Sequence, residues 1–372
     1  MNTAIVFIDK CDQQGLAKSP ILDKTLLDYT IDHLKKAGSD NLIVVSKEEV
    51  RINDVMWLDN VKDLDIIIPD LDGKLILSGI HYPSITADVY YNLYHSSAQA
   101  SVVKVNDEFV DIFMMPCCEF RNYAKLRYEI YNVEDADFVK VDSALKLVEF
   151  ASKRRKAINH QHLMNGVNFI DIESTYIGED VEIDKGVTLY PNTCLEGKTS
   201  IGSNTIITAN SHLINATIGS DCKILSSRVS DSIIHDKVSV GPYSHLRMNC
   251  DISDNCRIGN FVEFKNAQFG KGSKSAHLTY IGDSEVGQDV NIGCGVITVN
   301  YDGAHKYRTV IKDKAFIGSN ANIIAPVTIG QQALVAAGST VTRDVEDGAM
   351  AISRVRQEDK PGYGYRYITK EK

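Results

Sequence analysis

Aliphatic residues recur at every sixth position over the second half of the chain. The repeat is cleanest at Ile317, Ile323, Ile329, Val335 and Val341. This spacing fits neither a helix, whose apolar residues return about every 3.6 positions, nor a strand, whose side chains alternate. It is typical of a parallel β-helix, in which each six-residue piece is one flat side of a coil and the aliphatic side chains stack inward. Gly or Asn then takes corners that need a positive φ, and three Ile-Gly pairs, at 281–282, 317–318 and 329–330, fit that interpretation.

The same period begins near residue 176 and predicts a long prism. Seven residues fall six apart in its first part: Ile177, Ile183, Leu189, Leu195, Ile201, Ile207 and Leu213. The spacing is irregular between Ile218 and Val240, where we expect an excursion of one or two residues per coil, and it resumes with Ile252, Ile258 and Phe264. At about 18 residues per coil, residues 175–345 give about nine or ten coils. Such prisms usually form trimers, and the grooves between neighbouring subunits become binding sites.

The first part of the chain has a different pattern, in which short apolar runs alternate with an amphipathic segment. Residues 4–8, 41–45 and 74–77 predict buried strands, and residues 26–36 predict a helix. We therefore expect an α/β domain with a parallel sheet over residues 1–140. A linker helix at residues 141–165 then leads to a left-handed parallel β-helix and a C-terminal tail at residues 166–372.

Composition narrows the class of protein. The 372 residues are 44% hydrophobic, and the formal net charge is −9. The charge disfavours a nucleic-acid binder, although an acidic average leaves room for a basic pocket that binds a phosphorylated metabolite. Charged residues at positions 9, 10 and 12 interrupt the opening apolar run before a secretory signal could form, so we expect a cytoplasmic protein without a membrane segment. The eight cysteines form no CxxC pair, which predicts reduced thiols and no metal site.

Polar residues within the β-helix carry the candidate chemistry. His277 lies among small polar residues, where an imidazole is either an inert corner residue or a general base. Arg247 and Lys265 are about one coil apart, so that they could stack on one side of the prism and clamp a phosphate. Glu263 is a carboxylate that could orient the imidazole of His277. Residues 300–303 break the repeat and predict an extruded loop beside the His277 coil.

The motifs that contain these residues resemble one family. They are Gly259-Asn-Phe-Val-Glu-Phe-Lys265, Lys271-Gly-Ser-Lys-Ser-Ala-His-Leu-Thr-Tyr-Ile-Gly-Asp283, Asn291-Ile-Gly293, Asn300-Tyr-Asp-Gly303, Gly318-Ser319, Ala336-Ala-Gly-Ser-Thr-Val-Thr-Arg343 and Ala351-Ile-Ser-Arg-Val355. The set resembles the acetyltransferase half of the bacterial bifunctional glucosamine-1-phosphate acetyltransferase / N-acetylglucosamine-1-phosphate uridyltransferase. The resemblance runs in order, without large gaps, over about residues 165–365.

This resemblance implies a homotrimer that transfers an acetyl group from acetyl-CoA to the amine of glucosamine 1-phosphate, with His277 as general base. It implies substrate contacts by Arg247, Lys265, Tyr280 and Asn291, and acetyl-CoA contacts by Cys294, Asn300, Tyr301, Ser319, Ala337 and Arg354. The family usually has a small alanine where this chain has Cys294, and we expect the slightly larger thiol to be tolerated. A backbone amide near the thioester would stabilise the oxyanion.

The first domain resembles the nucleotidyltransferase half of the same family more weakly. The family's two glycines, catalytic arginine, lysine and metal-binding asparagine correspond in this chain to Lys10, Asp12, Gln14, Ile21 and Asp142. Residues 77–83 occupy the place of a metal-binding motif but lack its aspartate. The domain is also too short to hold much of the family's sugar-binding half. We therefore expect a degenerate domain without uridyltransferase activity, and a need for Mg²⁺ only if that domain is active.

Two alternatives of a different class remain open. In the first, unusual residues preserve nucleotidyltransferase activity, and the protein is bifunctional and also forms UDP-N-acetylglucosamine, a cell-wall precursor, from UTP. Tight, magnesium-dependent binding of UTP would favour it. In the second, the chain is a non-catalytic scaffold that binds sugar phosphate and CoA, and His277 is only inherited. A hexapeptide acyltransferase that uses another acyl donor or amino sugar is a third possibility.

Overall fold

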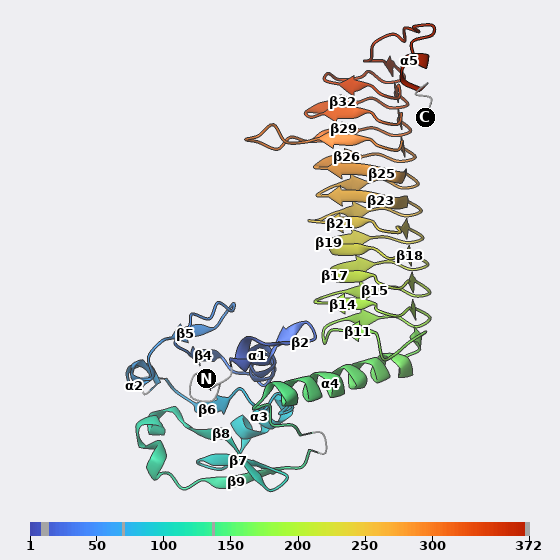
Figure 1. Cartoon of the computed structure of the whole chain (residues 1–372). Coiled ribbons are helices and arrows are strands. Elements are labelled where there is room, and N and C mark those ends of the chain that lie inside the picture. Colours follow the sequence, from blue (N-terminus) through green and yellow to red (C-terminus); the bar gives the residue numbers. More distant parts are fainter. Residues whose placement is uncertain (9–14, 69–70, 136–137, 369–372) are drawn as a thin grey trace. The chain divides into compact units, whose positions relative to one another are not determined.

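The computed structural model describes residues 1–8, 15–68, 71–135 and 138–368 (Figure 1). The chain divides into two compact units, Met1–Ile158 and Asn159–Lys372. Among the described helices, none is long and apolar enough to cross a membrane.

A seven-stranded sheet forms the centre of the first unit, in the order β5-β4-β1-β6-β8-β7-β9. Its strands are β1 (Thr3–Phe7), β4 (Asn41–Val45), β5 (Met56–Leu58), β6 (Lys74–Gly79), β7 (Ser101–Val105), β8 (Glu108–Pro116) and β9 (Glu129–Val133). The other elements are the small pair β2 (Pro20–Ile21) and β3 (Lys24–Thr25), the helices α1 (Leu26–Lys36), α2 (Leu64–Ile67) and α3 (Ala87–His95), and 3₁₀ turns at Leu16–Lys18, Val61–Asp63 and Cys117–Lys125. The three predicted strands and the predicted helix are confirmed.

The sheet is parallel from β5 through β4 and β1 to β6, as predicted, but β8 runs antiparallel to both β6 and β7. The local cause is the turn between β7 and β8. Asn106 and Asp107 have φ values of 46° and 74°, and two successive residues with positive φ form the tight turn that joins antiparallel strands. Alternate residues of β1 serve opposite faces of the sheet, because Ala4 and Val6 belong to one apolar core and Ile5 to the other.

A 21-residue helix, α4 (Ala144–Met164), runs through the division between the units. In its first half, Leu147 and Phe150 join the apolar core of the first unit. In its second half, the side-chain amide of the buried Asn159 donates to the carbonyls of Ile172 and Thr175, each at 2.9 Å. The helix predicted at residues 141–165 is therefore present, at Ala144–Met164.

The second unit is a parallel β-helix whose short strands stack on three faces (Figure 1). The first face contains β11 (Tyr176–Ile177), β14 (Cys194–Glu196), β17 (His212–Ile218), β19 (Arg228–Ile234), β21 (His245–Arg247), the end of β23 (Arg257–Lys265), the end of β25 (Lys274–Gly282), β28 (Ile297–Val299), β31 (Asn322–Ile324) and β34 (Thr340–Val341). The second contains β12 (Glu182–Ile183), β15 (Ser200–Ile201), the ends of β17 and β19, β22 (Asp251–Ile252), β24 (Gln268–Phe269), β26 (Ser284–Val286), β29 (Thr309–Ile311) and β32 (Val327–Ile329). The third contains β10 (Asn168–Phe169), β13 (Thr188–Leu189), β16 (Ile206–Ile207), β18 (Lys223–Ile224), β20 (Ser239–Val240), the starts of β23 and β25, β27 (Asn291–Ile292), β30 (Phe316–Ile317), β33 (Leu334–Val335) and β35 (Met350–Ala351). A short helix, α5 (Tyr365–Ile368), follows.

The six-residue repeat marks the interior of this prism. Ile177, Leu189, Leu195 and Leu213 are fully enclosed, and Ile183 is half-buried near the start of the prism. The irregular stretch differs from the expectation. Coils there are shortened, because β17 and β19 each continue from the first face to the second as one strand, with a single residue of positive φ, Asn215 or Asp231, at the corner. No extra residues loop out between them.

The glycines of the Ile-Gly pairs have a different role from the expected one. Gly282, Gly318 and Gly330 do not have positive φ. Gly318 and Gly330 lie against the backbone of the next coil, and Gly282 lies against the Tyr280 side chain. A Cβ on Gly318 would lie 2.5 Å from the amide nitrogen of Ala337 in the next coil. Positive φ falls shortly after these pairs, for example at Asn320, where φ is 56°.

The loop predicted at residues 300–303 is confirmed as an extruded hairpin between β28 and β29 (Figure 1). Tyr301 and Lys306 form an antiparallel bridge across it. The hairpin leaves the prism at the corner between the first and second faces and therefore stands beside the last residues of the first face.

Candidate functional site

Two cations stack at the edge of the first face, as the sequence predicted. Arg247 on β21 and Lys265 on β23 are direct partners in adjacent coils. Nε and Nη2 of Arg247 donate to Oε1 of Glu263 at 3.0 and 2.6 Å, which fixes the guanidinium beside the Lys265 ammonium. Such a pair of cations can bind a phosphate.

The position of Glu263 corrects one expectation. The sequence suggested that its carboxylate orients the imidazole of His277, but the strand register places Glu263 beside His245 and Tyr280, and its carboxylate binds Arg247. Asn260 is the residue that lies opposite His277. The interval between these two coils is 17 residues, so the strand partner of Glu263 is Tyr280, three residues beyond His277.

His277 is exposed on β25, at the corner between the third and first faces. Its Nδ1 lies 2.7 Å from Oδ1 of Asn260. Because an amide oxygen can only accept, Nδ1 carries the hydrogen and donates it. The lone pair of Nε2 is then directed away from Asn260 and is available to accept a proton, which is the requirement for a general base.

The carboxylate of Asp283, held between two asparagine side chains, lies next to the two cations. Asp283 accepts hydrogen bonds from the side-chain amide of Asn266, at 2.6 Å, and from that of Asn300. Burial acts to raise the pKa of Asp283, but the two amides and the ammonium groups of Lys265 and Lys306 outweigh it, so that the pKa is lowered. The pKa of Lys265 is also lowered, first by the neighbouring Lys306 and then by burial, against the opposing effect of Asp283. The site therefore holds a surplus of positive charge.

Tyr280 and the hairpin residues complete this edge. Burial raises the pKa of Tyr280, and a hydrogen bond with the Asn300 side chain opposes the shift. Asn300 is buried at the base of the hairpin, whereas Tyr301 is exposed and its hydroxyl donates to the carbonyl of Gly303 at 2.5 Å. The structure thus brings together Arg247, Glu263, Lys265, Tyr280 and Asn300.

Three of the predicted cofactor residues form a column at the other edge of the first face. The register of β25, β27, β30 and β33 places Cys294, Ser319 and Ala337 in the equivalent turns of the three coils that follow His277. Backbone bonds link these turns, since Asn320 N donates to the carbonyl of Cys294 and Gly338 N to that of Ser319, both at 2.8 Å. All three side chains are small and exposed.

Two other predicted residues lie near this column. The side chain of Arg354 is exposed, and its Cδ lies 3.8 Å from a Cβ built on Gly338. Asn291 lies on the third face, between Lys274 and Phe316 of the neighbouring coils. The base, Asn291 and four of the predicted cofactor residues therefore share one corner, whereas the cations share the other corner with Asn300 and Tyr301.

Two of the positions compared with the nucleotidyltransferase half, Ile21 and Asp142, lie within the described part of the first unit. Ile21 is completely buried, so its side chain cannot contact a ligand. Residues 77–83, which lack the aspartate, lie beside the segment that holds Asp142. The amide of Val141 donates to the carbonyl of His81, and Nδ1 of His81 donates to the carbonyl of Val141 at 2.6 Å. His81 is buried and Asp142 is exposed. Lys10, Asp12 and Gln14 lie outside the described residues.

Sequence reasoning missed Asn260 and Lys306. Asn260 falls within a quoted motif, and a 17-residue coil would have paired it with His277. Lys306 could not be found by spacing, because it lies on the hairpin, where the repeat no longer constrains position.

The fold defines a hexapeptide-repeat protein, and residues 308–343 match the family described as bacterial transferase hexapeptide (six repeats). This chain resembles the bifunctional protein GlmU of several bacteria. The relative from Shouchella clausii is 48% identical over 223 residues, which are 60% of this chain and 49% of the relative. That from Geobacillus thermodenitrificans is 52% identical over 63% of this chain and 51% of the relative, and that from Listeria monocytogenes serotype 4a is 45% identical over 78% and 60%.

The chain thus spans about half the length of the curated relatives it matches, from 49% to 60% for these three bacterial proteins. Among solved structures, the Arabidopsis UDP-N-acetylglucosamine acyltransferase is 17% identical, with a TM-score of 0.33, over 48% of this chain and 69% of that chain.

Proposed function

We propose that this chain transfers an acetyl group from acetyl-CoA to the amine of glucosamine 1-phosphate, giving N-acetylglucosamine 1-phosphate for the synthesis of UDP-N-acetylglucosamine. The observation that carries the proposal is the geometry of His277, whose Nδ1 is fixed by Asn260 so that Nε2 is free to act as a base. The similarity to GlmU over most of the β-helix supports the same assignment.

The proposed reaction uses His277 for proton transfer. Nε2 takes a proton from the sugar ammonium, and the neutral amine attacks the thioester carbonyl. The C–S bond then breaks, the thiolate of CoA leaves and recovers a proton from the imidazolium, and the second proton that the attacking nitrogen loses on becoming an amide passes to solvent. Arg247 and Lys265 bind the sugar phosphate, Tyr280 and Asn291 contact the sugar, and Glu263 holds the Arg247 guanidinium in place.

The column of turns that follows His277, at the corner between the third and first faces, suits an extended cofactor. Cys294, Ser319 and Ala337 present short side chains at successive coils, about 4.8 Å apart. Arg354 would pair with a phosphate of CoA. The hairpin stands at the opposite edge of the first face, so in a trimer Asn300 of the partner subunit and Tyr301 of the partner subunit would bound the acetyl end. A thioester bound along this column would reach His277.

The separation of the two edges supports the proposal of a homotrimer. Lys265 lies five residues beyond Asn260 on β23, a span of at most about 18 Å along the strand. The base, His277, and the phosphate-binding pair, Arg247 and Lys265, therefore lie at opposite edges of the first face in one chain. In a trimer, the edge that holds His277 in one chain meets the edge that holds Arg247 and Lys265 in its neighbour, and a single sugar phosphate contacts both edges.

For the rest of the chain we propose the organisation expected from the sequence. Residues 1–140 are a degenerate nucleotidyltransferase-like domain that has lost uridyltransferase activity and Mg²⁺ binding, residues 141–165 are a linker helix, and residues 166–372 are the acetyltransferase domain. The buried Ile21 and His81 support the loss. We also propose that the protein is cytoplasmic.

The test is an assay of the full chain with glucosamine 1-phosphate and acetyl-CoA that follows free thiol, and then pyrophosphate after addition of UTP and Mg²⁺. Thiol release is expected, with a loss of about 10²- to 10⁴-fold in His277→Ala. His235→Gln, at another exposed histidine of the β-helix, is the matched control and should keep its activity. Absence of thiol release in the wild type would favour the scaffold alternative, and pyrophosphate production would favour the bifunctional one.

A further inference from the structure

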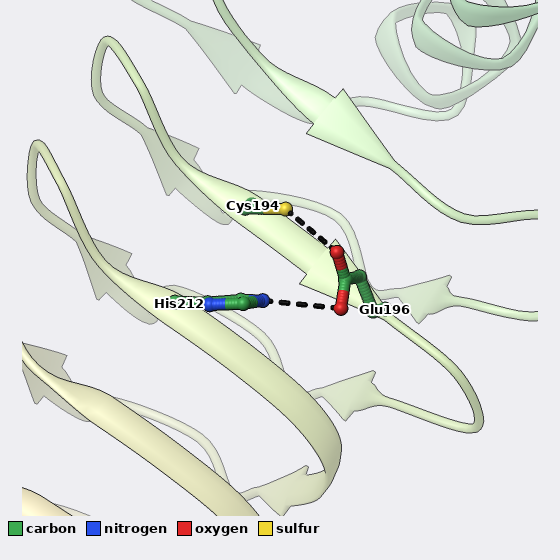
Figure 2. Close-up of side chains that lie close together, drawn as sticks. All are labelled: Cys194, Glu196 and His212. Carbon is green, nitrogen blue, oxygen red and sulfur yellow. Dashed lines mark hydrogen bonds and ion pairs between the residues drawn. The ribbon is translucent and has the colours of Figure 1, made fainter. Parts of the chain in front are cut away.

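Cys194, Glu196 and His212 form a compact group on the first face, several coils before the site described above. Cys194 and Glu196 lie on β14 with the buried Leu195 between them, so that both side chains point outward. His212 on β17 is the direct partner of Cys194 in the next coil. Figure 2 shows the thiol and the imidazole on either side of the Glu196 carboxylate.

The distances within this group match those between the ligands of a metal ion. Sγ of Cys194 lies 3.2 Å from Oε1 of Glu196, and Nε2 of His212 lies 3.1 Å from Oε2. The thiol, imidazole and carboxylate ligand atoms lie within 4.8 Å of one another, the one such group of three among the described residues. A tetrahedral Zn²⁺ with bonds of about 2.3 Å to S and about 2.0–2.1 Å to N and O sets its ligand atoms roughly 3.3–3.6 Å apart. Because no two ligand atoms are more than 4.8 Å apart, side-chain adjustments of up to about 1.5 Å would admit the ion.

The imidazole of His212 supplies a second, independent indication. Its Nε2 is shielded from solvent and makes no hydrogen bond within the described part of the chain. Glu196 lies at ion-pair distance, but without hydrogen-bond geometry. A shielded polar atom is ordinarily bonded, so this nitrogen calls for a partner that uses its lone pair. A metal ion held jointly with the thiolate and the carboxylate is such a partner.

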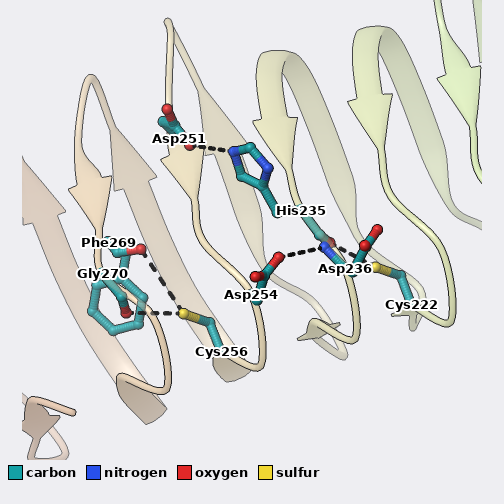
Figure 3. Close-up of polar contacts among 8 residues, drawn as sticks. All are labelled: Cys222, His235, Asp236, Asp251, Asp254, Cys256, Phe269 and Gly270. Carbon is teal, nitrogen blue, oxygen red and sulfur yellow. Dashed lines mark hydrogen bonds and ion pairs between the residues drawn. The ribbon is translucent and has the colours of Figure 1, made fainter. Parts of the chain in front are cut away.

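Other thiols of the β-helix have a different environment (Figure 3). Cys222 and Cys256 are buried, and their S–H groups donate to the carbonyls of His235, at 3.0 Å, and Gly270, at 3.2 Å. Burial raises the pKa of Cys256 to about 11, which disfavours the thiolate that a metal requires. Cys194 differs from both, because it faces outward and contacts a carboxylate that can share a cation with it.

We propose that Cys194, Glu196 and His212 bind one divalent transition-metal ion of the Zn²⁺ type and thereby tie two successive coils together. Thiolate, imidazole and carboxylate are the ligands that Zn²⁺ takes, and three protein ligands leave a fourth position for solvent. The exposed Arg228, which follows His212 in the same column, opposes a cation and weakens binding relative to a site without it. The sequence expectation of no metal site relied on CxxC pairs, whereas these ligands are a Cys-x-Glu and a His one coil later.

The test is equilibrium dialysis of the full, chelator-treated chain against Zn²⁺ under reducing conditions, together with Co²⁺ substitution followed by thiolate-to-cobalt charge-transfer absorption. One ion per chain is expected. Cys194→Ser, Glu196→Gln and His212→Gln should each lower the affinity at least about 10-fold, and Cys194→Ser should also abolish the charge-transfer band. Two matched controls are Cys118→Ser, at an exposed thiol, and His235→Gln, which removes the histidine of the His235–Asp251 ion pair, measured at 3.0 Å (Figure 3).

Circular dichroism of each variant verifies that the fold is retained. The proposal is overturned if the wild-type chain takes up no Zn²⁺, or if its uptake and cobalt spectrum are the same in Cys194→Ser. It is equally overturned if either control loses as much affinity as the ligand variants, because the ion would then be bound elsewhere. Acetyltransfer is measured separately, since none of these three residues lies in the proposed active site.

Discussion

Asn260 offers the sharpest test of the proposed mechanism, because it acts on the base through one hydrogen bond. In Asn260→Ala, the Nδ1–H of His277 loses its 2.7 Å acceptor. The imidazole is then free to rotate and to place its proton on either nitrogen. Only the tautomer with an unprotonated Nε2 is productive, so the fraction of competent enzyme falls.

The size of the effect follows from the strength of that bond. A hydrogen bond of this kind contributes about 0.5–1.5 kcal/mol net. At about 1.36 kcal/mol for each tenfold change in rate, kcat should fall about 2- to 13-fold. KM for both substrates should stay within about twofold, because Asn260 positions the base and does not bind substrate.

Thiol release under saturating substrates measures kcat, and titration of each substrate gives KM. Asn168→Ala, which truncates an exposed asparagine at the start of the β-helix, is the control and should match the wild type. Asn260→Asp should keep most of the rate but move the acid limb of the pH–rate profile to higher pH, because a carboxylate favours the protonated imidazole. An unchanged kcat in Asn260→Ala, or a loss as large as that of His277→Ala, would refute the reasoning.

Three further predictions concern stability. The pKa of Asp283 is lowered in the folded state, so its carboxylate stabilises the fold at pH values above its unfolded pKa of about 3.9, and this stabilisation is lost as the pH falls through the lowered pKa. Asp283→Asn should therefore flatten the fall of Tm on the acid side of a plot of Tm against pH. An unaltered fall would contradict this. Phe264→Ala removes a fully buried ring and should lower the free energy of unfolding in urea by about 3–5 kcal/mol, so a loss below about 1 kcal/mol would argue against the packing. Gly318→Ala should cost about 1–3 kcal/mol in the same assay because its Cβ would meet the next coil, whereas Gly364→Ala, with no atom within 4 Å of its Cβ, should be neutral.

The sequence predicted the β-helix well because one physical cause produces both the repeat and the fold. Each inward position stacks on its equivalent in the next coil, so an apolar residue is required at a fixed interval. Leu189 and Ile207 follow this rule, and both are fully enclosed. The strands of the first unit were predicted for a similar reason, since a strand buried on both faces, like β1, is continuously apolar. The antiparallel β8 was not, because its direction depends on two φ angles in a short turn.

The site was harder to predict, because outward residues obey no repeat. Stacking of Arg247 on Lys265 was found since their 18-residue interval is the regular one. Glu263 was assigned to the wrong partner because the expectation did not use the register of β23 on β25, in which Glu263 lies opposite Tyr280 and Asn260 opposite His277. Lys306 was missed altogether, since a hairpin returns it to Lys265 from outside the prism.

Unequal coil lengths also explain how a regular prism can carry an irregular site. Along the corner column, His277, Cys294, Ser319 and Ala337 are separated by 17, 25 and 18 residues, yet they occupy equivalent turns. The longest interval contains the hairpin, and the inward stack continues past it through Ile311, which is buried. The corner of a coil can therefore lengthen without disturbing the core, because only the flat sides stack. The proposed chemistry is accordingly placed where the chain is free to vary, and the aliphatic repeat that supports it is preserved on either side.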